Sequence, residues 1–359
     1  MKRLLIFLPT IGYGGAEMSL TRIAGYLSEQ NKINIDLVVA KKLDKSDEIN
    51  ISNEINITYL NSKKTIFSLF KLLKIIRNSK PDVILSTLPT PNLMVIILKQ
   101  LKLINSKVVL REANSNYLNW QNGLLNKIKG QISIFAFNKS DTNIFISQEL
   151  QTNLEKLISN RRNITIYNPV LIDNFFEKSL EEVLDFKKPN SELWVTTSRL
   201  EHQKGLDLLF EAAYKFLGKR KFSILVVGDG SQEFHYKKMY SDLPITFIGN
   251  TQNPLKYLNL ADIFFFPSRR EGLGNSLIEA QILGKNIISS DCPSGPKEII
   301  NLFENGMLFE SENVHELVQT INNFQIKDNN IVSQEIISKF SVSTIGNQYH
   351  DFLLKILKS

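Results

Sequence analysis

The first forty residues predict the fold class. "RLLIFLP" (residues 3–9) is almost wholly apolar after its arginine, and the glycine-rich "TIGYGGAE" (10–17) follows it directly. A helical stretch, "MSLTRIAGYLSEQ" (18–30), and a second apolar run, "INIDLVVAK" (33–41), come next. Strand, glycine turn, helix and strand in this order are the opening of a βαβ unit. Continuously apolar strands are typical of parallel sheets that helices cover on both faces, so we expect an α/β fold.

The same alternation continues along the chain in two series. A polar stretch with two prolines (166–192) separates them. The further strand-like runs are 81–87, 107–112 and 142–147 in the first series, and 193–199, 222–230, 245–250, 262–268 and 286–291 in the second. At 359 residues the chain exceeds what one hydrophobic core usually supports. We therefore predict two Rossmann-like, doubly wound domains facing a central cleft.

The expected domain bounds follow from these runs. They are 1–170 for the N-terminal domain, 171–190 for a linker, 191–340 for the C-terminal domain and 341–359 for a C-terminal helix that packs back on the N-terminal domain. In such sheets, ligands bind where loops leave the carboxyl ends of the strands. Each motif described below lies at such an end.

Composition places the chain among ordinary globular proteins. With 43% apolar and 22% charged residues, it does not have the composition of a disordered chain. A single cysteine, Cys292, excludes an internal disulfide framework and fits a reducing compartment. The N-terminal apolar run is shorter than a signal-peptide core, and we find no stretch long enough to span a bilayer. We expect a cytoplasmic protein.

The positive charge is concentrated in the first half. Residues 1–170 hold 23 Lys/Arg and 12 Asp/Glu, whereas residues 171–359 hold 20 and 24. Within the first half, residues 63–80 combine lysines with apolar residues at helical spacing, and residues 120–140 form a second such segment. The apolar positions of the first segment are Ile66, Leu69, Phe70, Leu73 and Ile76. A basic amphipathic helix can lie on an anionic membrane, but the same stripe is also suited to packing on the sheet.

Two cations follow the first strand of the second series. In "TTSRLEHQKGLDLL", Arg199 and Lys204 lie on either side of a strand-to-helix turn that Gly205 closes. Cations beside the amides of a helix N-terminus form a binding site for a diphosphate. Exposed basic loop residues would look the same. Gly228, in "VVGDGS", lets the backbone approach a flat ligand, although many such turns contain glycine.

A glycine loop with two glutamates follows a later strand. In "PSRREGLGNSLIEA" (267–280), Glu271 precedes Gly272 and Gly274, and Glu279 lies about one turn into the next helix. We expect Asn275 or Ser276 to cap this helix. Since carboxylates only accept hydrogen bonds, both glutamates are suited to gripping vicinal hydroxyl groups. The alternative is that Glu279 is a first-turn acid favoured by the helix dipole and Glu271 an ordinary loop residue.

Four motifs in order carry a resemblance to a known family. "SRL…QKG", "VVGDG", "ADIFFFPSRREGLGNSLIEA" and "SDCPSGPKEII" resemble the retaining glycosyltransferases of family four, the glycogen-synthase-like group 1 enzymes with the GT-B fold. Weaker similarity covers the first half through "GGAE" and "REANS". The resemblance implies that the N-terminal domain binds the acceptor and that the C-terminal domain binds a nucleotide sugar.

The resemblance also assigns roles to residues. Glu271 is expected at the donor sugar, and Arg199 and Lys204 at the diphosphate, as the catalytic set. Glu279 is expected at the ribose, and Lys297 near the sugar or phosphates, although a rigid loop with a solvent lysine is the alternative for Lys297. The whole expected donor-binding set is Gly14, Gly15, Gly228, Gly272, Leu273, Gly274, Asn275, Glu279 and Lys297.

One position departs from the family pattern. Many relatives carry a histidine where this chain has Ala113, so an imidazole from that loop is not expected in catalysis. Arg111, Glu112 and Asn114 remain as polar candidates on the acceptor side, together with Glu17 of the "GGAE" turn. His202 lies in the phosphate loop, where we expect it to be exposed to solvent.

The expected reaction is transfer of a hexosyl or N-acetylhexosaminyl group from a UDP-linked or related nucleotide sugar, with retention at the anomeric carbon. The resemblance implies a lipid-linked or glycan acceptor of bacterial surface polysaccharide, such as O-antigen or capsule, at the inner face of the cell membrane. We find no Asp-x-Asp or histidine cluster for a metal, so we expect neither a metal nor a cofactor beyond the nucleotide sugar. A phosphate oxygen of the leaving group is the expected proton acceptor.

Four other functions are compatible with parts of the sequence. A hydrolase could use Glu271 and Glu279 as an acid/base pair, but that leaves the two cations without a role. A dinucleotide oxidoreductase would have a G-x-G-x-x-G turn, which "GYGGAE" is not. A 2-epimerase-like enzyme of the same fold needs acid/base groups at the sugar, and Ala113 makes this less favoured. Only the positive charge favours nucleic-acid binding.

Overall fold

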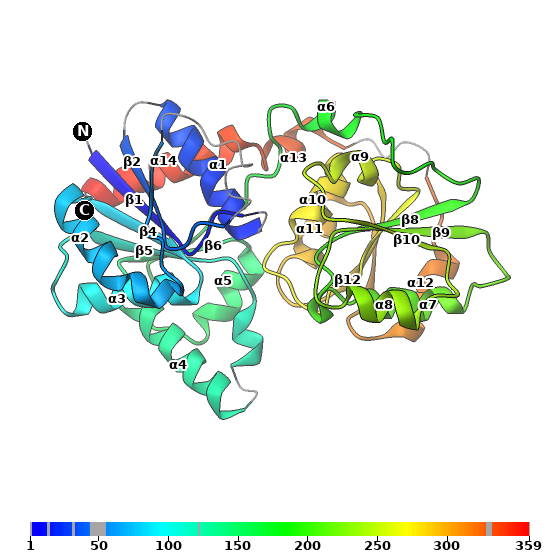
Figure 1. The fold of residues 1–359 in the computed structure, drawn as a ribbon, viewed down its shortest axis with the longest axis horizontal. Helices are drawn as coiled ribbons and strands as arrows, with labels where there is room; N and C mark the ends of the chain where they lie inside the picture. The colour runs from blue at the N-terminus through cyan, green and yellow to red at the C-terminus, as the bar shows by residue number, and fades with distance from the viewer. Residues whose placement is uncertain are drawn as a thin grey trace. The chain divides into compact units, whose positions relative to one another are not determined.

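The structure is a computed structural model that describes residues 2–12, 15–30, 33–43, 55–120, 123–327 and 332–358. The chain forms two compact units (Figure 1). Unit 1 comprises Met1–Val170 and Lys339–Ser359, and unit 2 comprises Leu171–Ser338. The chain therefore leaves unit 1 once, builds unit 2 and returns.

Unit 1 contains a seven-stranded parallel sheet. The spatial order of its strands is β3-β2-β1-β4-β5-β6-β7. The central strands β1 and β4 are buried along most of their length because helices cover both faces of the sheet. The strands are β1 (Lys2–Leu8), β2 (Ile33–Val39), β3 (Asn56–Tyr59), β4 (Val83–Thr87), β5 (Lys107–Glu112), β6 (Thr142–Phe145) and β7 (Asn163–Thr165).

The last helix of the chain packs against the first. Figure 1 shows α14 (red) beside α1 (blue), where the expected helix over residues 341–359 lies. The ring of Tyr26 packs directly on the backbone of α14 at Gly346, where a Cβ would lie 2.1 Å from Tyr26 Cδ1. The helices of unit 1 are α1 (Gly15–Glu29), η2 (Thr65–Ser68), α2 (Leu69–Ser79), α3 (Pro89–Gln100), η3 (Asn116–Asn119), α4 (Leu124–Lys139), α5 (Gln148–Glu155) and α14 (Val342–Lys358).

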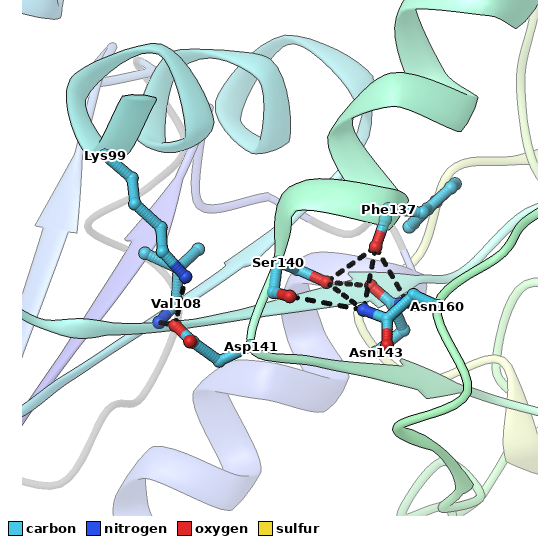
Figure 2. A network of polar contacts seen from close by, with 7 residues as sticks. All are labelled: Lys99, Val108, Phe137, Ser140, Asp141, Asn143 and Asn160. Carbon is cyan, nitrogen blue, oxygen red and sulfur yellow. Dashed lines mark hydrogen bonds and ion pairs between the residues drawn. The ribbon is translucent and has the colours of Figure 1, made fainter. Parts of the chain in front are cut away.

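A polar network, the amino-edge network, holds the start of β6 (Figure 2). Asp141 Oδ2 accepts hydrogen bonds from Lys99 Nζ at 2.5 Å and from the backbone N of Val108 at 2.6 Å. Buried Asn143 accepts a hydrogen bond from Ser140 Oγ at 2.7 Å and donates one to the carbonyl oxygen of Phe137, in the last turn of α4. Because buried polar groups need partners, this network fixes the turn between α4 and β6. Its seven residues are Lys99, Val108, Phe137, Ser140, Asp141, Asn143 and Asn160.

Unit 2 contains a six-stranded parallel sheet in the order β10-β9-β8-β11-β12-β13. Aromatic side chains fill its core: the Trp194 ring stacks on Phe222 with centroids 4.4 Å apart and lies 4.9 Å from Phe265. The strands are β8 (Glu192–Thr197), β9 (Phe222–Val227), β10 (Ile245–Gly249), β11 (Ile263–Phe266), β12 (Asn286–Asp291) and β13 (Met307–Glu310).

The helices of unit 2 connect these strands on both faces of the sheet. They are α6 (Phe175–Ser179), η4 (His202–Lys204), α7 (Leu206–Tyr214), α8 (Glu233–Met239), α9 (Leu255–Leu258), α10 (Asn275–Ile282), α11 (Pro296–Phe303), α12 (Val314–Asn323) and α13 (Gln334–Ser338).

The expected linker, residues 171–190, is packed onto unit 2. Phe175 of α6 is buried, Asp185 accepts a hydrogen bond from Tyr257 Oη at 2.8 Å, and Lys188 Nζ lies 2.7 Å from Asp262 Oδ1. A segment without hydrophobic periodicity can still be ordered by such individual contacts, which the sequence pattern does not reveal.

Both sheets reverse their strand order at one place. The chain builds outward from β1 in one direction and then from β4 in the other, and β8 and β11 repeat this in unit 2. Ligands of doubly wound sheets bind outside the carboxyl ends of the strands at such a switch point. In unit 2, the loops after β8 and β11 flank this switch point.

Candidate functional site

The predicted site motifs of unit 2 meet along one edge of its sheet. Arg199 and Lys204 follow β8, Gly228 follows β9, Glu271 follows β11 and Lys297 follows β12. These four strands are neighbours and run parallel, so their carboxyl ends and the loops that leave them lie at the same edge. We call this the carboxyl edge of unit 2. Arg199 is exposed on it.

An ion pair joins the two loops that flank the switch point. Lys204 Nζ lies 2.5 Å from Glu271 Oε1, and only 15% and 9% of their side chains are exposed. The Phe266 ring supports the ammonium group, with its centroid 5.9 Å from Lys204 Nζ. An ammonium group has three donors, so Lys204 can keep this bond while it donates to an anion.

A second cation, Arg269, clamps the same two loops, although no sequence motif predicted a role for it. Its guanidinium group binds both carboxylate oxygens of Asp207, each at 2.7 Å, and donates through Nη1 to the carbonyl oxygen of His202 at 2.8 Å. Its Nε donates to Glu312 at 2.7 Å. Burial alone would raise the pKa of Asp207, but the hydrogen bonds and charge of Arg269 outweigh burial and lower it.

Two further hydrogen bonds, one between backbone groups and one from a side chain, complete the clamp. The N–H of Arg269 donates to the carbonyl oxygen of Gln203 at 2.8 Å, and Gln203 Nε2 donates to that of Arg270 at 2.9 Å. These bonds join the residues that directly precede Lys204 and Glu271 in the two loops. The clamp therefore fixes the separation of the two charges. The only local signals for it in the sequence are an arginine inside "PSRREG" and an acid in the first turn of α7.

Two glycines let the loops approach each other. Gly205 has φ of +64°, and a Cβ there would lie 2.1 Å from the carbonyl oxygen of Pro267. Gly228 has φ of +133°, and a Cβ there would lie 2.0 Å from the carbonyl oxygen of Ser198. Since other residues rarely adopt such φ values, both positions require glycine.

The glycine loop leads directly into α10. Gly272 and Leu273 are buried, and Gly274 is the N-cap residue, so the expected cap by Asn275 or Ser276 is wrong: the helix starts at Asn275 itself. A glycine cap has no side chain to cover the first turn. Glu279 lies four residues into α10 and is half-buried.

The segment after β12 carries an exposed ion pair. Lys297 lies in the first turn of α11, and its Nζ is 3.0 Å from Asp291 Oδ2 at the end of β12. His202 is exposed in η4. Both side chains lie at the carboxyl edge of unit 2.

In unit 1, the expected residues lie around the ends of β1 and β5. Gly14 lies outside the described residues. Gly15 is the first residue of α1, and Glu17 lies half-buried in the first turn of that helix.

Arg111 points into unit 1. It is fully buried, its Nη2 donates to Asn168 Oδ1 at 2.5 Å, and its Nη1 lies 3.3 Å from the carbonyl oxygen of Ala16 and 3.4 Å from Thr87 Oγ1. The guanidinium group thus holds the start of α1 from inside. Its hydrogen-bond partners are neutral groups of the protein.

Glu112 is a buried carboxyl group at the end of β5. Its Oε1 accepts hydrogen bonds from the backbone N of Ala113 at 3.1 Å and of Asn114 at 3.0 Å. Burial raises the pKa of Glu112 to about 7, although both hydrogen bonds and the charge of Arg111 act to lower it. Asn114 is half-buried beside it, and Ala113 is buried.

The basic segment 63–80 forms η2 and α2 and divides its apolar residues between core and solvent. Ile76 is buried, as the packing alternative predicts, whereas Phe70 is 83% exposed. The apolar residues of segment 63–80 therefore do not form one continuous exposed stripe. Within the described ranges, no helix is both long and apolar enough to cross a membrane. The same residues contain no group of three or more His, Cys, Asp or Glu side chains that could hold a metal ion.

Family models match the two halves of the chain separately. Residues 13–174 match the model described as glycosyltransferase family 4, and residues 182–337 match glycosyl transferases group 1. Together these matches cover most of the chain.

Curated relatives are named as glycosyltransferases. An uncharacterized glycosyltransferase of Methanocaldococcus jannaschii is 27% identical over 64% of this chain and 61% of that protein, so the match spans less than two thirds of its length. The N-acetylgalactosamine-N,N'-diacetylbacillosaminyl-diphospho-undecaprenol 4-alpha-N-acetylgalactosaminyltransferase of Campylobacter jejuni is 24% identical over 89% of each protein. The capsular polysaccharide biosynthesis glycosyltransferase CapH of Staphylococcus aureus is 24% identical over 83% of each.

Solved structures share the fold of the whole chain. Anabaena Alr3699/HepE in complex with UDP superposes with a TM-score of 0.75 at 17% identity, covering 99% of this chain and 100% of that one. A sucrose-phosphate synthase from Thermosynechococcus elongatus gives 0.80 at 14% identity, covering 100% of both. These likenesses confirm the expected two-domain α/β fold, GT-B, and the family models confirm the resemblance drawn from the motifs. The chain belongs to the glycosyltransferases, with a family 4 N-terminal half and a group 1 C-terminal half.

Proposed function

We propose that this glycosyltransferase moves a hexosyl or N-acetylhexosaminyl group from a UDP-linked sugar to a lipid-linked or glycan acceptor of bacterial surface polysaccharide. The observation that supports the donor assignment is the pairing of loops at the switch point of unit 2, with Arg199 and Lys204 after β8 and Glu271 after β11. Cations and acids so placed suit a diphosphate and sugar hydroxyl groups, respectively. UDP is bound by the Anabaena protein, which has the same fold.

The names of relatives support the proposed acceptor. The Campylobacter jejuni enzyme is named for a diphospho-undecaprenol-linked sugar, and the Staphylococcus aureus protein for capsular polysaccharide. We propose an acceptor of the same chemical class and action at the inner face of the cell membrane. The basic segment 63–80 with its exposed Phe70 is compatible with contact to an anionic membrane.

The proposed chemistry needs charge stabilisation at the leaving group. As the bond from the anomeric carbon to the diphosphate oxygen breaks, UDP leaves with added negative charge, which Arg199, Lys204 and the first amides of α10 would stabilise. The acceptor oxygen bonds to the anomeric carbon on the same face, so the configuration is retained. Its proton passes to a phosphate oxygen of UDP. In this proposal no metal ion takes part.

The positions of the remaining predicted site residues in the fold suggest which part of the ligands each one contacts. Glu271 binds donor-sugar hydroxyls, Glu279 the ribose, and Gly228, Gly274 and Lys297 lie on loops that border the same edge. Gly272, Leu273 and Asn275 belong to the turn that carries these groups. In unit 1, we propose that Gly14, Gly15, Glu17, Glu112 and Asn114 border the ligands, whereas Arg111 acts from inside by holding α1.

A thermal-shift series tests the donor assignment. UDP, UDP-N-acetylglucosamine, UDP-N-acetylgalactosamine, UDP-glucose, GDP-mannose and NAD are each added to the whole chain. A true donor at about a hundredfold excess over its Kd stabilises the fold by about 2.7 kcal/mol. The Lys204→Ala variant should lose this stabilisation, whereas Lys219→Ala, an exposed lysine after α7, should keep it. If UDP-linked and GDP-linked compounds all leave the melting temperature unchanged, the proposal is wrong.

A further inference from the structure

A cavity beside α7 and α12 contains none of the predicted site residues. Its volume is about 660 Å³, which lies within the range of cavities that bind ligands. Residues between 215 and 220, which follow α7, line one part of it, and α12 lines the other. The two helices pack against each other (Figure 1). We call this hollow the α7–α12 cavity.

The α7–α12 cavity has an apolar floor. Phe216 is buried there, and Val314 and Val318 are half-buried. Val314, Val318 and Asn322 are four residues apart along α12, so they share the side of the helix that lines the cavity. Leu217, the neighbour of Phe216 in the chain, is 43% exposed. The apolar surface therefore continues from the floor of the cavity to its rim.

Three cations border this floor. They are Lys215, Lys219 and Arg220, and both lysines are exposed. Arg220 Nη2 lies 2.6 Å from Glu192 Oε1, and Nη1 donates to the carbonyl oxygen of Ile321 at 3.2 Å. Since a guanidinium group has five N–H donors, Arg220 can keep both bonds and still bind another carboxylate.

The positive charge is local to this part of unit 2. Residues 215–221 contain four Lys/Arg and no Asp/Glu, whereas residues 171–338 hold 17 and 23. None of the eight residues that line the α7–α12 cavity is acidic. Because opposite charges attract and like charges repel across an interface, an acidic partner is drawn to this cavity and repelled by the acidic remainder of the unit.

We propose that the α7–α12 cavity docks an acidic segment of a partner protein. One apolar side chain of the segment enters the cavity and packs on Phe216, and flanking carboxylates bind Lys215, Lys219 and Arg220. A lipid bilayer fits poorly, because it cannot reach the floor of a hollow. Since Arg220 pairs at the start of β8, the cationic side lies at the opposite end of the strands from the carboxyl edge of unit 2. A docked partner therefore leaves the candidate donor site open.

Calorimetric titration of the full chain with short peptides tests this docking site. The probe is the capped peptide EEELFEEE. In one control peptide, EEESSEEE, serines replace the apolar pair, and in the other, QQQLFQQQ, glutamines replace the acids. The chain should bind the probe at least tenfold more tightly than either control, since floor and cations both contribute. A probe that does not bind, or that binds no better than one of the controls, would overturn the proposal.

Two variants locate the binding of the probe. Lys215→Glu/Lys219→Glu should lower its affinity at least tenfold by reversing two charges at the rim. Asn322→Trp, a change at an exposed position, should lower it as much by filling the cavity without altering any charge. Melting temperatures equal to that of the wild type would show that both variants fold.

The matched control makes the same change of net charge elsewhere on unit 2. Lys187→Glu/Lys238→Glu alters exposed lysines outside the cavity lining and should bind the probe like the wild type. Equal loss of affinity in the two double variants would mean that only the overall charge attracts the peptide, which contradicts a docking site.

Other binding modes give different results in the same assay. Arg199→Ala should keep the affinity for the probe, and UDP should not displace it; displacement would place the peptide at the donor site and refute the proposal. Phosphatidylglycerol vesicles that bind through Lys215 and Lys219, when the peptide does not bind, would make lipid the partner instead. The titration needs no nucleotide sugar, so its outcome is independent of the donor assignment.

Discussion

The first six strands of each unit have the same spatial order, but the carboxyl edges of the two sheets hold their charged groups differently. In unit 2, Lys204 pairs with Glu271 and Arg269 pairs with Asp207, each pair joining loops from neighbouring strands. In unit 1, the guanidinium group of Arg111 is buried among neutral partners. Glu112, next to it in sequence, accepts hydrogen bonds from the backbone N–H groups of Ala113 and Asn114.

This difference separates ligand-binding groups from groups that hold the fold. A charge whose partner is another side chain in a loop can exchange or share that partner with an incoming anion or hydroxyl group. A charge enclosed by backbone groups cannot move without unfolding its surroundings, because a buried unpaired charge is costly. The comparison therefore predicts that changes at the carboxyl edge of unit 2 mainly lower activity, whereas changes at Arg111 and Glu112 lower stability in addition to any effect of Glu112 on ligand binding.

Removing Arg199, the exposed cation that follows β8, should have the largest effect. Arg199→Ala should lower kcat by about 10²–10³-fold, as removal of one group that stabilises transition-state charge does. The melting temperature should stay the same, since Arg199 is exposed. Steady-state transfer kinetics measure this, with Lys219→Ala as the control cation. A rate per bound donor equal to that of the wild type would exclude the leaving-group role.

Breaking the clamp should affect both activity and stability. Arg269→Ala should lower the free energy of unfolding by about 2–3 kcal/mol, less than for a fully buried pair because its partner Asp207 is partly exposed. It should also lower kcat/KM at least tenfold, because the Lys204–Glu271 spacing loosens. Urea unfolding and transfer assays measure the two effects.

The control for the clamp is an arginine ion pair at the opposite end of the same sheet. Arg220 Nη2 lies 2.6 Å from Glu192 Oε1 at the start of β8. Arg220→Ala should destabilise the fold and leave kcat/KM unchanged. Equal loss of kcat/KM in both variants would mean that stability alone explains the clamp.

The buried carboxyl group of unit 1 should give stability an unusual pH dependence. Between its ordinary pKa of 4.5 and its raised pKa of about 7, the folded state binds more protons at Glu112 than the unfolded state does. Its contribution to stability therefore falls as the pH rises through that window and levels off above it. Glu112→Gln should remove this fall, worth about 2 kcal/mol between pH 5 and pH 8.

Unfolding in urea at several pH values measures this, and Glu201→Gln is the control. Hydrogen bonds from Ser231 lower the pKa of Glu201, so its contribution is lost as the pH falls rather than as it rises. A Glu112→Gln variant with the wild-type pH profile would show that Glu112 is ionised in the fold throughout.

The amino-edge network should give the smallest effect and a purely structural one. Asn143→Ala removes a buried amide that bonds to Ser140 and Phe137, and should cost about 1–2 kcal/mol of stability. The values of kcat and KM should not change, since the network lies at the start of β6, away from both carboxyl edges. Asn78→Ala, an exposed residue of α2, should change neither quantity.

Local patterns in the sequence predicted the fold because each strand and the turn after it are specified by neighbouring residues. Apolar runs such as "RLLIFLP" and "DIFFFPS" and the glycine turns after them identify parallel strands and the loops at their ends. The carboxyl edge of unit 2 follows from the same signals, because motif and strand are adjacent in the chain.

Contacts between distant residues could not be predicted in this way. Arg269 and Asp207 are 62 residues apart, and Asn168 lies 57 residues after Arg111. No periodicity records such pairs, so the clamp was missed and Arg111 was expected to border a ligand rather than to lie inside. The stripe over residues 63–80 was only half right, because the pattern alone does not show which apolar residues the sheet covers.

The place of α14 has a consequence for how the protein is made. Helix α14 (Val342–Lys358) follows unit 2 in the chain, yet it fills the core of unit 1, through Ile345, Tyr349 and Leu353. During synthesis, unit 2 can close as soon as residue 338 has emerged, whereas unit 1 stays incomplete until α14 has emerged as well. The nascent N-terminal sheet therefore waits, with the α1 side of its core uncovered, for a helix synthesised some three hundred residues later.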